Sequence, residues 1–261
     1  MINSEGLYQK FLQLLYSTDE ANVAVALQMA QDSNHPKVKH LLRQFLLLMR
    51  RWVDVGIDVP DPKLICRFNA PRLDLSEKVV KGLAPEIGVL VNLIDLDLHN
   101  NNFWMLPDGI TQLHQLQSLN LSENDLSYLP DDMGKLRCLK HLNLADNDFS
   151  VFPPELKDLP QLESLSMSNN CSTILPEWLG ELKNLTSLDL SNNQIKTLPA
   201  GLGSLTSLQL LVLNNTLIEE VPPEIKNLKN LQHIYLPKIH LSATALANLE
   251  PLSAWAMVAV R

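Results

Sequence analysis

Residues Leu185 to Ser207 read LTSLDLSNNQIKTLPAGLGSLTS, and this stretch decides the fold because its pattern recurs along the chain at intervals of 23 residues. A looser copy occupies residues 70–92, and a decaying copy begins at Leu231. Self-similarity at a fixed period predicts a solenoid, in which stacked repeats bury one continuous core. The template LxxLxLxxNxLxxLP starts, without any insertion, at Leu93, Leu116, Leu139, Leu162, Leu185 and Leu208.

The fixed letters of the template predict the structure of one repeat. The LxL segment alternates leucine with polar residues, as a half-buried strand does, so the strands of successive repeats are expected to pair in parallel. A proline at the fifteenth position presets a helical turn on the outer side. An asparagine at the ninth position is expected to satisfy buried backbone groups where the chain turns away from the strand. These asparagines are Asn101, Asn124, Asn147, Asn170 and Asn193.

These repeats resemble the leucine-rich repeat superfamily, and within it the 23-residue intracellular type of Ras-interacting and Scribble-like scaffolds and of many bacterial proteins. The resemblance covers about two thirds of the chain. It implies an α/β fold: a right-handed solenoid with a parallel concave sheet and short helical or 3-10 turns on the convex side. The residues before the repeats add an expected N-terminal α-helical cap, described below. Members of this superfamily are mostly protein-binding platforms, so the resemblance also implies a protein-interaction scaffold. The lack of catalytic motifs, described below, predicts that the protein is not an enzyme.

Composition and charge narrow the classes of partner. The chain has 261 residues and a formal net charge of -8. Residues 1–69 hold eight Lys or Arg against seven Asp or Glu, which leaves 13 against 22 for the repeats and the C-terminal segment. An acidic repeat surface repels phosphate, so no binding of nucleic acid is expected. An odd number of cysteines (Cys66, Cys138 and Cys171) and the lack of a basic-apolar leader favour a cytoplasmic location.

Residues 1–69 are expected to form a helical cap or a small domain. Ser4 is the expected N-cap of a first helix, and Ser17 with Glu20 resembles a capping box for a second. Pro36 marks the start of a third helix, whose apolar residues recur at helical spacing. Residues 55–71, which contain three prolines, are interpreted as an irregular junction before the repeats.

The third helix has two interpretations. It is strongly basic between residues 37 and 51, through Lys37, Lys39, Arg43, Arg50 and Arg51. In the first interpretation its apolar face packs on the neighbouring helices and on the first repeat, since the apolar end of a solenoid must be covered. In the second it binds an anionic membrane surface, which would make the protein a membrane-surface adaptor.

The expected organisation is therefore a helical segment at 1–69, repeats at 70–241 and a C-terminal cap at 242–261. The C-terminal segment is expected to form one or two helices that seal the last strand with Leu246, Leu249, Leu252 and Trp255. A monomer is favoured. The chain could also be the recognition part of a larger enzyme or effector.

Function is expected on the concave face, where the third, fifth and seventh residues of each repeat point outward. We expect a protein or peptide ligand to be anchored near Tyr235 and oriented by Asp95 and Asp97. Two alternatives remain open: the middle of the face is an inert polar surface, or the C-terminal cap buries the apolar end. The candidate binding residues are Asp95, Asp97, His99, Asn120, His141, Asn143, Asp189, Leu210, Val212, His233 and Tyr235.

Other candidate sites are weaker. Trp104 and Trp178 fall at positions where the repeat does not demand an aromatic, so each is either a secondary contact or a solitary surface side chain. No hydrolase, phosphate-loop or zinc-protease motif occurs, and neither a catalytic residue nor a cofactor is predicted. His99, His141 and Asp97 could converge across strands, but their spacing does not predict a metal site.

Overall fold

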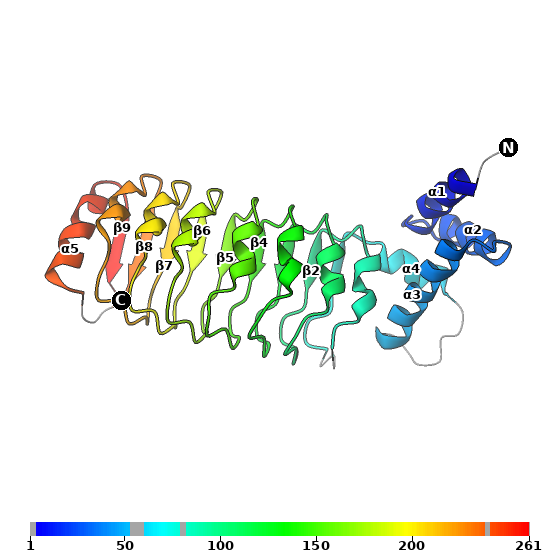
Figure 1. Cartoon of the computed structure of the whole chain (residues 1–261), viewed down its shortest axis with the longest axis horizontal. Coiled ribbons are helices and arrows are strands. Elements are labelled where there is room, and N and C mark those ends of the chain that lie inside the picture. Colours follow the sequence, from blue (N-terminus) through cyan, green and yellow to red (C-terminus); the bar gives the residue numbers. More distant parts are fainter. Residues whose placement is uncertain (1–3, 53–59, 79–81, 238–240, 261) are drawn as a thin grey trace.

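The computed structural model describes the chain apart from residues 1–3, 53–59, 79–81, 238–240 and 261. Within the described residues, nine strands form one parallel sheet in sequence order (Figure 1). Leu96 pairs with Leu119 and Leu119 with Leu142, so each step of the register advances 23 residues and the expected repeat is confirmed. The strands are β1 (Arg72–Asp74), β2 (Asp95–Asp97), β3 (Ser118–Asn120), β4 (His141–Asn143), β5 (Ser164–Ser166), β6 (Ser187–Asp189), β7 (Leu210–Val212), β8 (His233–Leu236) and β9 (Met257–Val260).

Short 3-10 turns form the opposite side of the solenoid, as the prolines predict. Each proline of the template stands immediately before its turn with an extended or near-extended backbone, as Pro107 and Pro176 do. The leucines of the strands and turns are buried between the two layers in one continuous core. The turns are η1 (Pro85–Val89), η2 (Asp108–Gln112), η3 (Asp131–Lys135), η4 (Pro154–Asp158), η5 (Glu177–Glu181), η6 (Ala200–Ser204) and η7 (Pro223–Asn227).

The buried asparagines join each repeat to the one before it, which confirms their expected role. Asn147 Nδ2 donates to the carbonyl oxygens of Leu121 (2.9 Å), Ala145 (3.0 Å) and Leu144 (3.2 Å). Its Oδ1 accepts the Leu126 N–H at 2.9 Å. The residue before each asparagine has a left-handed backbone, with φ of 54° at Asp146, so the chain leaves every strand through the same turn.

The N-terminal region contains α1 (Ser4–Leu15), α2 (Glu20–Gln31), α3 (Pro36–Trp52) and α4 (Pro62–Phe68). The three expected helices are confirmed, but the capping box is wrong. Asp19 is the N-cap of α2 and accepts the N–H of Ala21 at 2.8 Å, whereas Ser17 Oγ accepts the N–H of Asp19. The carboxylate stands one residue before the helix, which is the position from which a side chain reaches the second and third helical N–H groups.

The segment 55–71 is not wholly irregular. Its first five residues lie outside the described residues, but Pro62–Phe68 forms the helix α4. Asp61 caps this helix by accepting the Lys63 N–H at 3.0 Å, and Pro62 occupies its first turn. An Asp-Pro pair is typical of a helix start. It was not recognised because the three prolines of the segment favoured an irregular junction.

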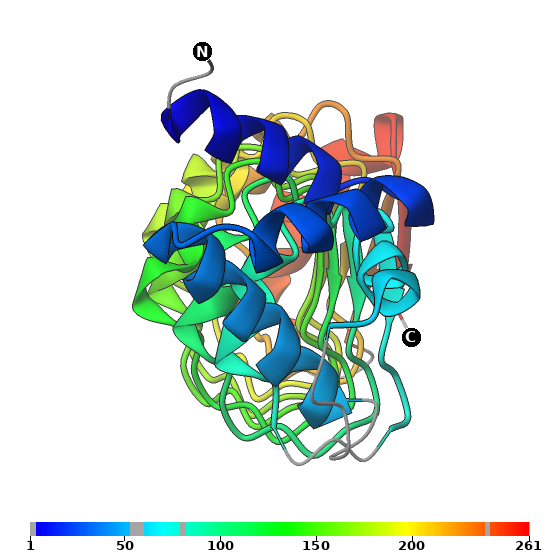
Figure 2. The same cartoon turned by 90° about the vertical axis from the view of Figure 1, so that its right-hand side faces the viewer.

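The helical region covers the first repeat, as Figure 2 shows end-on. Helix α3 lies against η1, and Phe45, Leu48 and Met49 are fully buried in the core that continues into the repeats. Asn69 Nδ2 donates to Leu15 O at 2.7 Å, and Asn92 Nδ2 donates to Tyr16 O at 3.1 Å. The packing interpretation of α3 is therefore supported, because the apolar face that a membrane would need is already buried.

The C-terminal segment differs from the expectation. It forms α5 (Ala243–Leu249), a 3-10 turn η8 (Glu250–Ala254) and then β9, which pairs with β8. Leu249 and Leu252 are buried and Trp255 is partly buried, but the prediction for Leu246 is wrong, since it is exposed. A short apolar run such as residues 256–260 suits a strand or a buried helix equally, so periodicity alone did not reveal β9. Within the described residues, no helix is both long and apolar enough to cross a bilayer.

Candidate functional site

The outward side chains of β1 to β9 form one surface, which we call the sheet face. The register aligns Asp95 with Ser118 and then His141 in one column, and Asp97 with Asn120 and then Asn143 in the next. The leucine between these columns points into the core. At about 4.8 Å between strands, the face is about 38 Å long. All the predicted site residues therefore lie on one surface or at its edge.

The N-terminal end of the sheet face is acidic. Asp95 and Asp97 are half-buried on β2, and Asp74 on β1 lies in register with Asp97. Arg72 Nε lies 3.7 Å from the Asp95 carboxylate. Sequence reasoning missed Arg72, Asp74 and also Glu77, because the copy at 70–92 matches the template only loosely, although counting back 23 residues from Asp97 leads to Asp74.

His99 belongs to this acidic end. Its Nδ1 lies 2.9 Å from Asp97 Oδ1, and its Nε2 lies 3.7 Å from a carboxylate oxygen of Glu77. The hydrogen bond to Asp97, together with the nearby charges of Asp97, Glu77 and Glu123, outweighs the effect of desolvation and raises the pKa of His99 above its ordinary value. The local charge at this end of the face therefore depends on pH.

Replacing Asp97 with asparagine is expected to lower the pKa of His99 toward its ordinary value, because the charged hydrogen-bond acceptor is lost. A raised folded-state pKa means that His99 stabilises the fold below its unfolded pKa, and this contribution disappears as pH rises through the folded pKa. The measurement is a pH titration of the His99 ring proton by NMR. The control, Asp189→Asn in the same column on β6, should leave the midpoint unchanged, and a wild-type midpoint at the ordinary value would contradict the assignment.

The middle of the sheet face is small and polar, and its fifth-position side chains have partners in their own repeat. Asn120 Oδ1 accepts the Ser122 N–H at 3.2 Å, and Asn143 Oδ1 accepts the Ala145 N–H at 3.1 Å. Asp189 Oδ1 accepts both the N–H (2.9 Å) and the Oγ–H (2.7 Å) of Ser191. Each side chain thus holds the turn at the end of its strand and offers a ligand only its remaining polar atom.

The C-terminal end of the sheet face is apolar and aromatic. Leu210 pairs in register with His233, and Val212 with Tyr235. The rings of His233 and Tyr235 stack with centroids 6.3 Å apart. Strand β9 adds Met257, an exposed side chain in register with His233. The alternative in which the C-terminal cap buries this end is wrong. His233 is exposed, and the side chains of Leu210, Val212 and Tyr235 are partly exposed.

The two tryptophans have different environments. Trp104 is exposed, whereas Trp178 is partly buried with its ring 5.7 Å from that of Phe152 in an edge-to-face contact. Trp178 is therefore part of the packing of the outer layer. His99 and His141 stand in different columns, and among the described residues no group of three or more His, Cys, Asp or Glu side chains could hold a metal ion.

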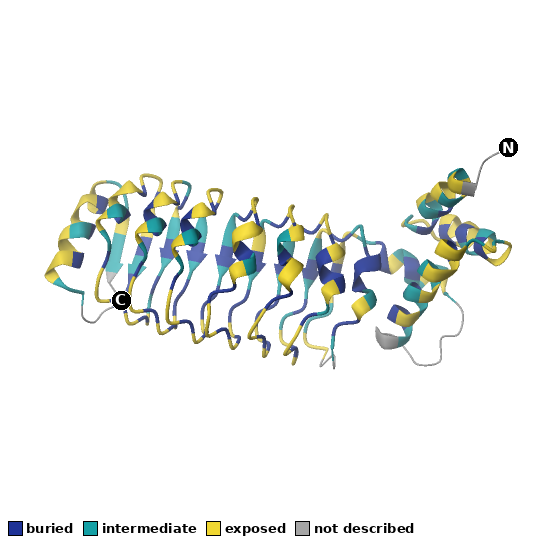
Figure 3. Ribbon diagram, in the orientation of Figure 1, coloured by how far each residue is buried: buried dark blue, intermediate teal, exposed yellow. Residues whose placement is uncertain are grey.

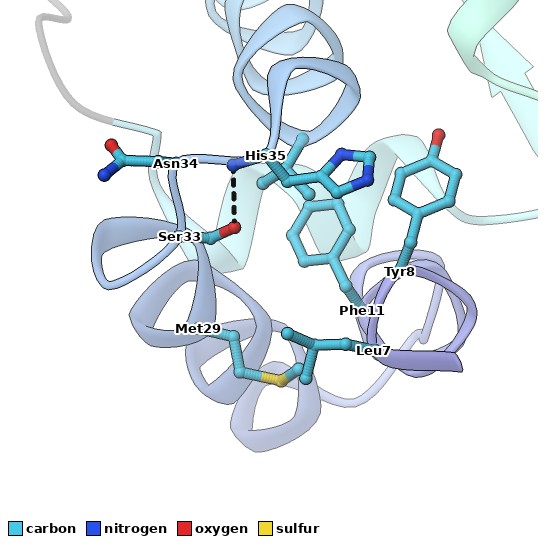
Figure 4. A pocket seen from close by; sticks show the side chains of 8 residues that line it. Leu7, Tyr8, Phe11, Met29, Ser33, Asn34 and His35 are labelled. Atoms are coloured by element: carbon cyan, nitrogen blue, oxygen red, sulfur yellow. Dashed lines mark hydrogen bonds between the residues drawn. The ribbon is translucent and has the colours of Figure 1, made fainter. Parts of the chain in front are cut away.

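A separate cavity of about 250 Å³ lies within the helical region, away from the sheet face. Figure 4 shows its walls, which come from α1, α2 and the start of α3. The His35 ring stacks on Tyr8 with centroids 5.2 Å apart, while Leu7, Phe11 and Met29 supply most of the remaining apolar surface. The volume suits a single large side chain and is smaller than a typical ligand pocket.

A family model described as a leucine-rich repeat region matches the chain at residues 63–170, 110–193 and 154–259. These matches together run from residue 63 in α4 to residue 259 in β9, which is well over half of the chain. No curated protein matches the chain.

Several solved structures are similar to the chain. An internalin of Listeria monocytogenes is 20% identical with a TM-score of 0.63, covering 75% of this chain and 57% of that chain. A plant peptide hormone receptor, RGFR1 in complex with RGF2, is 27% identical with a TM-score of 0.62, covering 74% and 32%. A leucine-rich repeat protein of Leptospira interrogans is 31% identical with a TM-score of 0.44, covering 71% and 59%. The chain thus spans less than two thirds of each of these proteins.

Proposed function

Because the chain belongs to the leucine-rich repeat family, we propose that it is a non-enzymatic interaction module that binds an extended peptide segment of a partner protein on its sheet face. Proteins with this repeat are typically interaction modules, and one structural neighbour is a receptor in complex with a peptide hormone. The observation that carries the proposal is the change in charge and polarity of the exposed side chains along the sheet face. An acidic end at β1 and β2 gives way to small polar side chains and then to an apolar, aromatic end at β7 to β9.

The distance between the two ends sets the length of the ligand, and the chemistry of each end sets the side chains that the ligand carries there. Asp97 on β2 and Tyr235 on β8 are six strand spacings apart, or about 29 Å. An extended chain covers this distance with about nine residues. The ligand has Lys or Arg near Asp95, Asp97 and Glu77, and an apolar side chain near Tyr235 and Met257. Small residues between the two ends leave room for its backbone to lie close to the sheet.

The test uses peptides selected from a randomised library on the immobilised chain, with their affinities measured by fluorescence anisotropy. The double variant Asp97→Lys with Tyr235→Ala is expected to bind them at least about tenfold more weakly, a loss of about 1.4 kcal/mol. The charge change repels a cationic ligand, and the truncation removes its aromatic anchor.

The matched control is Glu181→Lys, which makes the same charge reversal at an exposed residue of η5 on the other side of the solenoid. It should leave the affinities unchanged. Selected peptides that bind the double variant as tightly as the wild type would contradict the proposal and move the binding surface away from the sheet face.

A further inference from the structure

Four successive repeats expose a large apolar side chain at the thirteenth position. Met105, Tyr128, Val151 and Ile174 have exposed fractions of 40%, 48%, 70% and 71%, and Trp104 beside Met105 is 62% exposed. We call these five residues the flank stripe. They lie outside the strands, in the segments that lead from each asparagine turn to the next 3-10 turn. Figure 3 shows exposed residues recurring along the loops that join the strands to these turns.

The fold does not require these side chains to be apolar. In the same segments, the eleventh and fourteenth positions supply the core, for example Phe149 and Phe152, which are both buried. The next two repeats carry Thr197 and Glu220 at the thirteenth position and still form the 3-10 turns η6 and η7 directly after their prolines. An apolar row that is exposed on four neighbouring repeats and not needed for packing is typical of a surface that binds a partner.

The spacing of the flank stripe matches an α-helix. Backbone hydrogen bonds join the segments of the stripe to one another just before the thirteenth position. The Asp125 N–H donates to Phe103 O at 2.9 Å, Asp148 N–H to Leu126 O at 2.8 Å and Cys171 N–H to Phe149 O at 3.1 Å, so adjacent segments lie at the strand spacing of about 4.8 Å. One turn of an α-helix rises about 5.4 Å. A helix lying along the stripe therefore presents about one side chain to each repeat, at i, i+3 or i+4, and about ten residues span the roughly 14 Å from Met105 to Ile174.

Carboxylates border the flank stripe on both sides. The segments 102–109, 125–132, 148–155 and 171–178 together contain seven Asp or Glu and no Lys, Arg or His. Asp125 and Asp148 are exposed on the side of the asparagine turns, and Asp108 and Asp131 are exposed at the start of the 3-10 turns. A partner of complementary charge has cations on both sides of its apolar face.

We propose that the flank stripe binds an amphipathic α-helix of a partner protein, whose apolar side chains lie on Met105, Tyr128, Val151 and Ile174 and whose Lys or Arg side chains meet the bordering carboxylates. A second copy of the chain does not fit, because the same carboxylates would face each other across a symmetric contact. An anionic lipid surface is repelled by the same groups. The stripe is separate from the sheet face, so the two surfaces can hold two segments at once.

The probe is a fluorescein-labelled 14-residue amphipathic helix with Leu at i, i+4, i+7 and i+11 and Lys on both sides of that row. A scrambled peptide of the same composition is its control. Full-length protein is titrated against each peptide. Anisotropy should give a dissociation constant of roughly 100 µM or tighter for the amphipathic helix and no measurable binding for the scrambled peptide.

The variant Val151→Thr with Ile174→Thr uses the residue that already stands at Thr197, so the fold is expected to survive. It should weaken binding at least about tenfold, since two apolar contacts are lost. Asp125→Lys with Asp148→Lys should weaken binding and reduce its dependence on salt. The matched control, Leu217→Thr, changes an exposed apolar residue off the stripe and should have no effect.

Binding by the sheet-face variant Asp97→Lys with Tyr235→Ala should equal that of the wild type, which separates this proposal from the proposed function. Equal binding of helix and scrambled peptide, or binding indifferent to the threonine variant, would overturn the proposal. So would a wild-type dimer in sedimentation that the threonine variant converts to a monomer, since a second copy would then be the occupant. Sedimentation with anionic vesicles that the same variant abolishes would overturn it in favour of lipid.

Discussion

Replacing Asn147 with alanine is expected to lower the free energy of unfolding by about 3 kcal/mol, because one buried backbone group loses its partner and three further hydrogen bonds disappear. The Leu126 N–H has Asn147 Oδ1 as its acceptor, at 2.9 Å within the core. The carbonyls of Leu121 and Leu144 keep a second donor, from Asn124 and Asn170 respectively, so their loss is smaller. Chemical denaturation followed by circular dichroism measures the change.

Asn102→Ala is the matched control, since Asn102 is an exposed asparagine in the same kind of turn. It should leave the free energy of unfolding within about 0.5 kcal/mol of the wild-type value. An equal loss of stability for both variants would show that asparagine content, rather than the buried hydrogen bonds, matters. A midpoint unchanged by Asn147→Ala would show that water replaces the side chain in the turn.

Replacing Phe45 with alanine is expected to destabilise the helical region by about 3–5 kcal/mol, because a fully buried ring is removed from a packed core. The ring lies 5.9 Å from that of Tyr16 and belongs to the same helix face as Leu48 and Met49. Since α3 lies against η1, the variant should also weaken the first repeat. Amide hydrogen exchange, read separately for residues 4–52 and 85–135, distinguishes these effects.

Leu47→Ala is the control on the same helix, because Leu47 is exposed two residues away. It should change stability by less than about 1 kcal/mol. Nearly equal losses for the two variants would mean that α3 does not pack as described and would reopen the membrane-surface interpretation of its basic residues. Because Phe45 is buried, α3 presents to a membrane only the positive charges of Lys37, Lys39 and Arg43, which are exposed, while its apolar face lies in the core.

The regular part of the fold could be predicted from the sequence because every repeat places the same residue types at the same positions. The leucine spacing predicts the strands, the asparagine predicts the turn and the proline predicts the 3-10 segment, and all three agree with the structure. The ends were less predictable because they carry no repeated signal. Helix α4 was hidden among prolines, and β9 comes from an apolar run whose length suits two kinds of structure.

The candidate site was predictable only in part, for a similar reason. Counting along the repeat places Asp97 and Tyr235 on one face, as the register requires. It does not reveal Met257, which reaches the face through a strand outside the repeat pattern. It also assigns the whole side chain of Asp189 to a ligand, although Ser191 already binds one of its oxygens. Columns can be counted, but hydrogen bonds within a turn depend on backbone conformation.

The uniform strand register has a consequence for how such a molecule changes over generations. Because every step pairs residues 23 apart, an in-frame duplication of residues 139–161 would add one complete layer without any new kind of contact. It would move the acidic and aromatic ends apart by about 4.8 Å, which is the length of between one and two residues of an extended ligand. Recombination between repeats thus lengthens or shortens the binding surface in steps of one strand spacing, and the length of the recognised segment changes with it.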